Sequence, residues 1–248
     1  MKIGRIILRL LGFLLIFATW QVAGSIRASP ALPSPLIVLQ TVYILMRDGT
    51  LWPHIGSSLS IILRGIGFAV AFGFVIGVFM FQYKNFRIAT LPIIESVRGV
   101  AALTLFPLLI VFFGIGASSR IFIIFWTAWP AMALSTMASL DIDKSIVEAA
   151  MDFGAKPWRI MFTIRLPLAS KGILTGIRIG VGGGWIGLVA AEMLGATRGL
   201  GYFLLWSAQS FQFARVYAVI IVIAIIGGLM NLILLILQKN INKIIGVE

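Results

Sequence analysis

Asp141–Pro167 reads DIDKSIVEAAMDFGAKPWRIMFTIRLP, a polar stretch that lies between two long apolar runs, Ile121–Leu140 and Leu168–Leu194. Each run is long enough to cross the hydrocarbon core of a bilayer, which is about 30 Å thick and needs about 20 helical residues. The sequence therefore predicts two membrane-spanning helices that are joined by a charged loop.

The composition of the whole chain is that of a membrane protein. Of its 248 residues, 60% are hydrophobic and 11% are charged, whereas a soluble domain carries about 25% charged residues. Cysteine is absent, which excludes disulfides, thiolate metal sites and cysteine nucleophiles, and the single His54 cannot form a metal cluster alone. The net charge of +12 is better explained by Lys and Arg in cytoplasmic loops than by nucleic-acid binding.

Four further spans are predicted from apolar runs of similar length: Ile6–Ile26, Ser57–Phe81, Ile88–Phe113 and Val216–Leu237. The first run follows basic residues, as a signal peptide would, but it is long for a signal, so we expect a retained helix. Leu36–Met46 is shorter and amphipathic, which favours a helix lying at the membrane interface. The expected fold class is an all-α polytopic membrane protein with six transmembrane helices.

The distribution of basic residues predicts the orientation of these spans. Six spans place both termini on the same side of the membrane. When that side is the cytoplasm, most of the 20 Lys and Arg residues fall in cytoplasmic segments, as the positive-inside rule requires. The loop at Asp141–Pro167 is then cytoplasmic as well.

The loop itself has the local signals of two short helices at an angle. Asp141 or Asp143 can cap the first helix, and Gly154 can end it because glycine adopts the left-handed conformation at that position most easily. Pro157 can open the second helix. We expect Pro167 to separate the second helix from the next span.

The side chains of this loop are suited to contact with another protein. Glu148 and Asp152 lie one helical turn apart and offer carboxylates to Arg or Lys of a partner. Small residues beside them would let a partner approach closely: Ala149, Ala150, Gly154 and Ala155. The alternative is a membrane-surface loop that has no partner.

The pattern resembles the EAA loop of ABC importer permeases. It comprises Glu148, Ala149 and Ala150, then Gly154 six residues after Glu148, then Ile164, Leu166 and Pro167. The resemblance implies that the loop is a coupling helix, which docks in a cleft of a separate ATP-hydrolysing subunit. It also implies a type I importer permease with a MetI-like core at residues 57–238, preceded by an N-terminal helix and periplasmic interfacial segment at 1–56 and followed by a cytoplasmic tail at 239–248.

The same resemblance implies the partners of the chain. They are a second permease copy in a homodimer, two ATPase subunits and a periplasmic or lipid-anchored solute-binding protein, all at a prokaryotic inner membrane. The chain would not be an enzyme and would hold no cofactor, because ATP and Mg²⁺ would be bound by the ATPase. In agreement, the glycine-rich stretch Gly180–Gly184 is not followed by Gly-Lys-Ser/Thr, as a phosphate-binding loop would be.

Three further stretches look most like the nitrate/sulfonate/taurine-type permeases: His54–Leu59 (HIGSSL), Phe112–Gly116 (FFGIG) and Leu188–Met193 (LVAAEM) followed by Gly199–Gly201. This resemblance implies a small anionic solute such as nitrate, a sulfonate or taurine. Gly99–Ala102, after Arg98, departs from the Pro-rich stretch of the common pattern. A thiamine precursor or an aromatic acid is therefore the alternative cargo, and a secondary transporter is the alternative class.

Charged residues inside the predicted spans are costly and therefore mark possible functions. Glu95, Arg98, Arg178 and Glu192 could line a translocation path that favours an anion. Glu95 could instead pair with one of the two arginines, which would neutralise both partners. For Arg64 and Glu192 we also consider a position near the outer boundary, from which the charged ends reach water.

Overall fold

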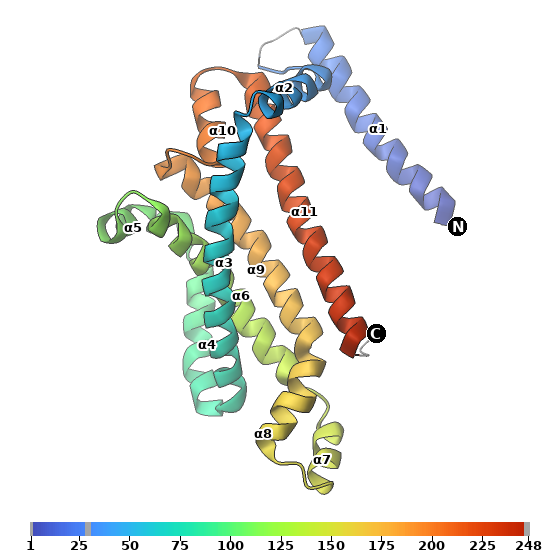
Figure 1. Cartoon of the computed structure of the whole chain (residues 1–248), viewed down its shortest axis with the longest axis vertical. Helices are drawn as coiled ribbons and strands as arrows, with labels where there is room; N and C mark the ends of the chain where they lie inside the picture. Colours follow the sequence, from blue (N-terminus) through green and yellow to red (C-terminus); the bar gives the residue numbers. More distant parts are fainter. Residues whose placement is uncertain (1, 28–30, 246–248) are drawn as a thin grey trace.

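The computed structural model describes residues 2–27 and 31–245, and its elements are helices that form an elongated bundle (Figure 1). Their bounds in chain order are α1 (Lys2–Arg27), α2 (Pro35–Arg47), α3 (Leu51–Gln82), α4 (Lys84–Gly99), η1 (Ala102–Leu105), α5 (Phe106–Phe113), α6 (Ala117–Leu140), α7 (Lys144–Asp152), α8 (Pro157–Ile160), η2 (Met161–Arg165), α9 (Leu166–Gly195), α10 (Leu200–Gln209) and α11 (Phe213–Ile245). The expected all-α class is confirmed.

Within the described residues, four helical stretches are long and apolar enough to cross a membrane: α3, α6, the run Pro157–Gly195 that ends with α9, and Phe213–Ile241 of α11. The helix expected at Ile6–Ile26 is present as α1. The count of six spans remains a prediction.

The span expected at Ile88–Phe113 is not one straight helix. It is divided between α4 and the η1–α5 segment, whose axes differ by 86°. Val100 and Ala101 have extended backbone conformations, which interrupt the helical hydrogen bonds. Pro107 follows in the first turn of α5, where the missing N–H of proline costs nothing. The local backbone therefore turns the chain within this stretch.

Glycines allow the central helices α3, α6 and α9 to approach one another closely. A Cβ atom at Gly73 of α3 would lie 2.5 Å from Cβ of Met132 in α6, and one at Gly176 of α9 would lie 2.5 Å from Cβ of Ser135. Small residues at such contacts are typical of helix packing in membranes. The glycine-rich Gly180–Gly184 stretch lies inside an unbroken α9, so close packing, not unwinding, is its structural role here.

The two ends of the bundle are formed by different short helices (Figure 1). At one end α2 lies across the bundle and packs on α11, while α10 packs between α9 and α11. At the opposite end α7 and α8 project beyond the long helices. The short helix expected at Leu36–Met46 is α2, whereas α10 was not predicted, since its residues were assigned to the loop between the last two spans.

The expected break at Pro167 is absent. Helix α8, the π-helical turn η2 and α9 form one continuous run, Pro157–Gly195, with Pro167 near the start of α9. A proline inside a helix has no N–H to donate and presses on the carbonyl four residues earlier. The wider π turn at Met161–Arg165 precedes it directly and accommodates this defect. Helix α8 is therefore continuous with a spanning helix.

Candidate functional site

The turn between α7 and α8 has the local structure that the sequence predicts. The carboxylate of Asp143 accepts a hydrogen bond from the backbone N–H of Ser145 at 3.0 Å and caps α7, and this bond lowers the pKa of Asp143 below its ordinary value. After α7, Gly154 adopts a φ of +78°. The N–H of Ala155 donates to the carbonyl of Ala150 at 3.0 Å and closes the turn.

Most of the predicted coupling residues on α7 and the turn are exposed. Glu148, Ala149, Asp152 and Gly154 lie on the surface, and Ala150 and Ala155 are half-buried. Large apolar side chains beside them are exposed as well: Phe153 is 93% exposed, Trp158 65% and Met151 50%. Such an apolar surface with carboxylates at its side is typical of a protein-interaction site.

The inner side of the same segment packs toward the long helices. Val147 of α7 and Ile160 of α8 are buried. Between these short helices and the end of α3 lies a groove of about 770 Å³, lined by Val78, Phe81, Gln82, Val147, Met151, Pro157, Trp158, Ile160, Met161, Phe162 and Arg165. Behind the exposed face of α7 there is thus a groove whose opposite side is formed by the end of α3.

Arg165 is a site residue that the sequence reasoning missed. Its guanidinium donates to the carbonyl of Leu140, the last residue of α6, at 2.8 Å and lies 4.7 Å from the ring centre of Phe81 in α3. A cation at a helix C-terminus and over an aromatic face is favourable in both contacts. The signal in the sequence was a single cation between two apolar residues, Ile164 and Leu166. Arg165 connects the segment that holds the predicted coupling residues to two spanning helices.

The other predicted coupling residues lie apart from the exposed face. Ile164, Leu166 and Pro167 are half-buried where η2 continues into α9. The predicted coupling residues therefore form two groups. One group lies on the surface of α7 and the turn after it, and the other lies where η2 continues into the spanning helix α9.

Of the charged residues predicted within spans, two form an ion pair. The guanidinium of Arg98 lies 3.3 Å from the carboxylate of Glu95 one turn earlier on α4, and both side chains are about half exposed. Pairing of Glu95 with an arginine is thereby confirmed. Arg178 on α9 is half-buried and has no ion pair within the described residues.

Glu192 does not lie on an exposed surface that could line a path, because its side chain is completely buried; its expected position near the outer membrane boundary stays a prediction. Its carboxylate accepts hydrogen bonds from the hydroxyl of Ser58 at 2.7 Å and from the N–H of Gly201 at 2.9 Å. The N–H of Leu200 donates in turn to the Ser58 hydroxyl at 2.9 Å. A buried carboxylate with several donors is well compensated, so Glu192 joins α3, α9 and α10.

The surrounding backbone completes this cluster at the end of the bundle opposite α7. The N–H of Gly199 donates to Nδ1 of His54 at 3.2 Å, and the guanidinium of Arg120 donates to the carbonyl of Arg198 at 3.4 Å. Gly199 has a φ of +136°, and a side chain there would overlap the Glu192 carboxylate. His54–Leu59, Leu188–Met193 and Gly199–Gly201, distant in the sequence, therefore meet in one hydrogen-bonded cluster.

Comparisons with known proteins agree with this architecture. Residues 69–246 match the family described as binding-protein-dependent transport system inner membrane component. The taurine transport system permease protein TauC of Escherichia coli is 37% identical over 230 residues, which cover 90% of this chain and 84% of the relative. The putative aliphatic sulfonates transport permease protein SsuC of Bacillus subtilis is 30% identical over 231 residues, covering 92% and 84%.

A solved structure shows the same fold. A chain of the inward-facing MetNI methionine ABC transporter superposes with a TM-score of 0.70 at 18% identity, covering 78% of this chain and 98% of that one. The resemblance inferred from the EAA pattern and from the three branch stretches is confirmed. The chain belongs to the binding-protein-dependent transport system inner membrane component family and is a multi-pass permease subunit of an ABC importer.

Proposed function

We propose that this permease carries a small sulfonate such as taurine and is driven through α7 and the turn that follows it. The proposed cargo is supported by the relatives named as taurine and aliphatic sulfonate permeases. A thiamine precursor or an aromatic acid is the alternative cargo.

The coupling role rests on one observation above all, the exposure of the α7 surface. Glu148 and Asp152 are exposed carboxylates without an ion pair in the described part of the chain. Phe153 projects beside them and is 93% exposed. A cleft of an ATPase that carries Arg or Lys would satisfy the carboxylates and cover the phenyl ring.

The proposed mechanism is alternating access. ATP binding draws two ATPase subunits together, and the docked α7 segments move with them. Because α8 continues through η2 into α9, this movement tilts a spanning helix and opens the path toward the other side of the membrane. The nucleotide can drive the change only by binding one transporter state better than the other. ATP and Mg²⁺ are held by the ATPase, and the permease itself needs no cofactor.

A second copy of the chain completes the path in this proposal. Helix α5 and the turn after it present a group of exposed apolar residues, among them Val111 at 80%, Phe112 at 72% and Ile115 at 71%. A homodimer would cover such a surface. The path between the copies would use Arg178 and the Glu95–Arg98 pair as its charged groups, and both termini would face the cytoplasm.

Uptake measurements test the proposed cargo. The chain is co-expressed with candidate ATPase and solute-binding subunits, and entry of labelled taurine into cells is followed. We expect saturable uptake that an excess of an aliphatic sulfonate reduces at least about tenfold, while an aromatic acid or a thiamine precursor leaves it unchanged. Competition by either of the latter compounds, with none by sulfonates, would assign the alternative cargo.

A further inference from the structure

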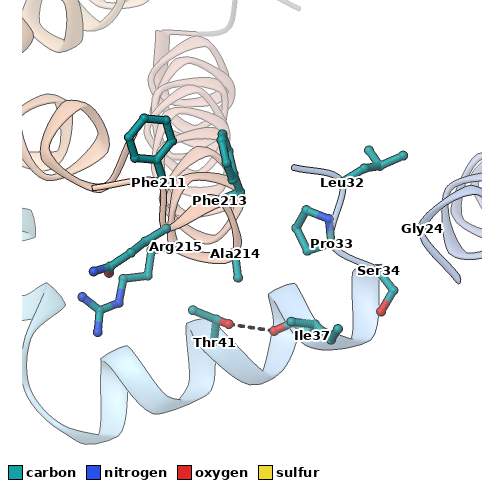
Figure 2. A pocket seen from close by; sticks show the side chains of 11 residues that line it. Gly24, Leu32, Pro33, Ser34, Ile37, Thr41, Phe211, Phe213, Ala214 and Arg215 are labelled. Atoms are coloured by element: carbon teal, nitrogen blue, oxygen red, sulfur yellow. Dashed lines mark hydrogen bonds between the residues drawn. The ribbon is translucent and has the colours of Figure 1, made fainter. Parts of the chain in front are cut away.

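A groove of about 560 Å³ lies at the end of the bundle opposite α7 (Figure 2). Three parts of the chain form it: Gly24 of α1, the segment from Leu32 to Thr41 that includes the start of α2, and Phe211–Arg215, which covers the turn after α10 and the first residues of α11. Figure 2 shows Ile37 and Thr41 of α2 on one side, with Phe211, Phe213 and Arg215 across from them. The volume is that of a site for a small organic group.

Aromatic residues beside the groove place it at the level of a membrane interface. The indole N–H of Trp20 donates to the carbonyl of Pro33 at 3.1 Å, and its ring lies 5.7 Å from that of Tyr217. Tryptophan and tyrosine gather where the hydrocarbon core meets the headgroups. Beyond the groove, α1 and α11 expose apolar side chains, including Leu15, Val22 and Ile220, which offer a surface for acyl chains.

The groove contains a cationic side chain that has no anionic partner within the described residues. Arg215 is half-buried and has no ion pair within the described residues. No carboxylate is among the residues that line the groove. A complementary ligand therefore carries a negative charge for Arg215.

We infer that this groove binds phosphatidylglycerol from the adjoining leaflet. Its phosphodiester supplies the anion for Arg215, and its headgroup carries no cation that would offset this charge. Its acyl chains lie on the exposed apolar residues of α1 and α11. In phosphatidylcholine and phosphatidylethanolamine, an ammonium group would lie near Arg215 without a carboxylate in the groove to balance it.

The bound lipid would stabilise the position of α1 and α2 against the rest of the helical bundle. Helix α1 packs against α2, and the groove joins both to the α10–α11 turn. A lipid that touches all three parts adds contacts that the protein alone does not make. A protein partner fits less well, because the groove is mainly apolar and lies beside the interfacial aromatic residues.

Native mass spectrometry of the full-length chain in detergent tests this inference. Phosphatidylglycerol, phosphatidylethanolamine and phosphatidylcholine are added in turn, with free glycerol phosphate as the probe for a headgroup without chains. We expect phosphatidylglycerol to bind at least about tenfold more tightly than phosphatidylcholine, a difference of about 1.4 kcal/mol, because phosphatidylglycerol has a net negative charge and phosphatidylcholine has none. Glycerol phosphate should bind far more weakly because it lacks the acyl chains.

Three variants locate the site. Arg215→Gln should lose about tenfold in affinity for phosphatidylglycerol, and Arg215→Lys should retain most of it. Arg47→Gln is the matched control, because Arg47 is an exposed arginine of α2 outside the groove, and it should behave as the unaltered chain.

Several outcomes overturn the inference. Equal binding of the three phospholipids to the unaltered chain does so without any variant, and therefore does not depend on how Arg215→Gln folds. Equal phosphatidylglycerol binding by Arg215→Gln and the unaltered chain also overturns it. The inference also fails if Arg215→Gln weakens binding of a solute-binding protein to the permease but leaves lipid binding unchanged.

Discussion

Glu148→Arg prevents assembly of the permease with its ATPase, and we expect the apparent affinity to fall at least about 100-fold. Glu148 lies exposed on α7 and has no ion pair within the described residues, so its charge is free for a partner. Loss of one member of a buried charge pair in an interface costs about 2–5 kcal/mol, and a reversed charge adds repulsion. A hundredfold change corresponds to about 2.7 kcal/mol.

Co-purification of the tagged permease with candidate ATPases measures this effect. The matched control is Asp141→Arg, which makes the same change of charge at an exposed residue that follows α6 directly. A cation there is favourable for the helix dipole and lies before the coupling helix. The control should assemble normally. Normal assembly of Glu148→Arg, or an equal loss in both variants, would contradict the proposed docking surface.

Glu192→Ala destabilises the folded permease by about 3 kcal/mol or more. The change removes a fully buried carboxylate and leaves the Ser58 hydroxyl and the Gly201 N–H without their acceptor. Each buried group left unsatisfied costs about 1–3 kcal/mol, and the cavity adds to this. For a chain of this size 1 kcal/mol corresponds to about 2–4 °C in Tm, so we expect a decrease of about 6–12 °C by thermal denaturation in detergent.

Glu95→Gln is the comparison for Glu192→Ala. Glu95 is also a glutamate within the helical bundle, but its side chain is 56% exposed and pairs only with Arg98 on the same helix. An exposed pair of this kind contributes about 1 kcal/mol or less, so Tm should change by less than about 4 °C. If the two variants have similar Tm values, the Glu192 cluster is not the structural connection that its hydrogen bonds indicate.

Local chemistry explains why the structure of α7 and the turn after it could be predicted from the sequence. The cap at Asp143 and the left-handed turn at Gly154 depend on residues within a few positions of each other. The exposed acidic and small residues of α7 follow from the same helix. Such features need no knowledge of distant parts of the chain.

The role of Glu192 could not be predicted, because its partner Ser58 is 134 residues away in the sequence. Without that contact, a glutamate near the end of an apolar run is equally consistent with a boundary position or a path-lining position. Arg165 was missed for a similar reason, since its contacts with Leu140 and Phe81 come from two other helices.

The two errors in helix boundaries arose from prolines whose surroundings were not known. Pro167 was expected to end a helix, but a π turn before it lets the helix continue. Pro107 was placed inside a straight span, although it begins a new helix after the extended residues Val100 and Ala101. A proline marks a defect in the hydrogen bonding of a helix, and the neighbouring turns decide whether the chain bends.

Cross-linking from single cysteines tests most directly whether α7 and its turn contact the ATPase. The chain contains no cysteine, so Lys156→Cys and Ser210→Cys each introduce one thiol at an exposed position, beside α7 and at the opposite end of the bundle respectively. With a reagent that joins a thiol to a lysine of the assembled ATPase, we predict a cross-linked product from Lys156→Cys and none from Ser210→Cys. A product from Ser210→Cys alone would contradict the proposed coupling surface.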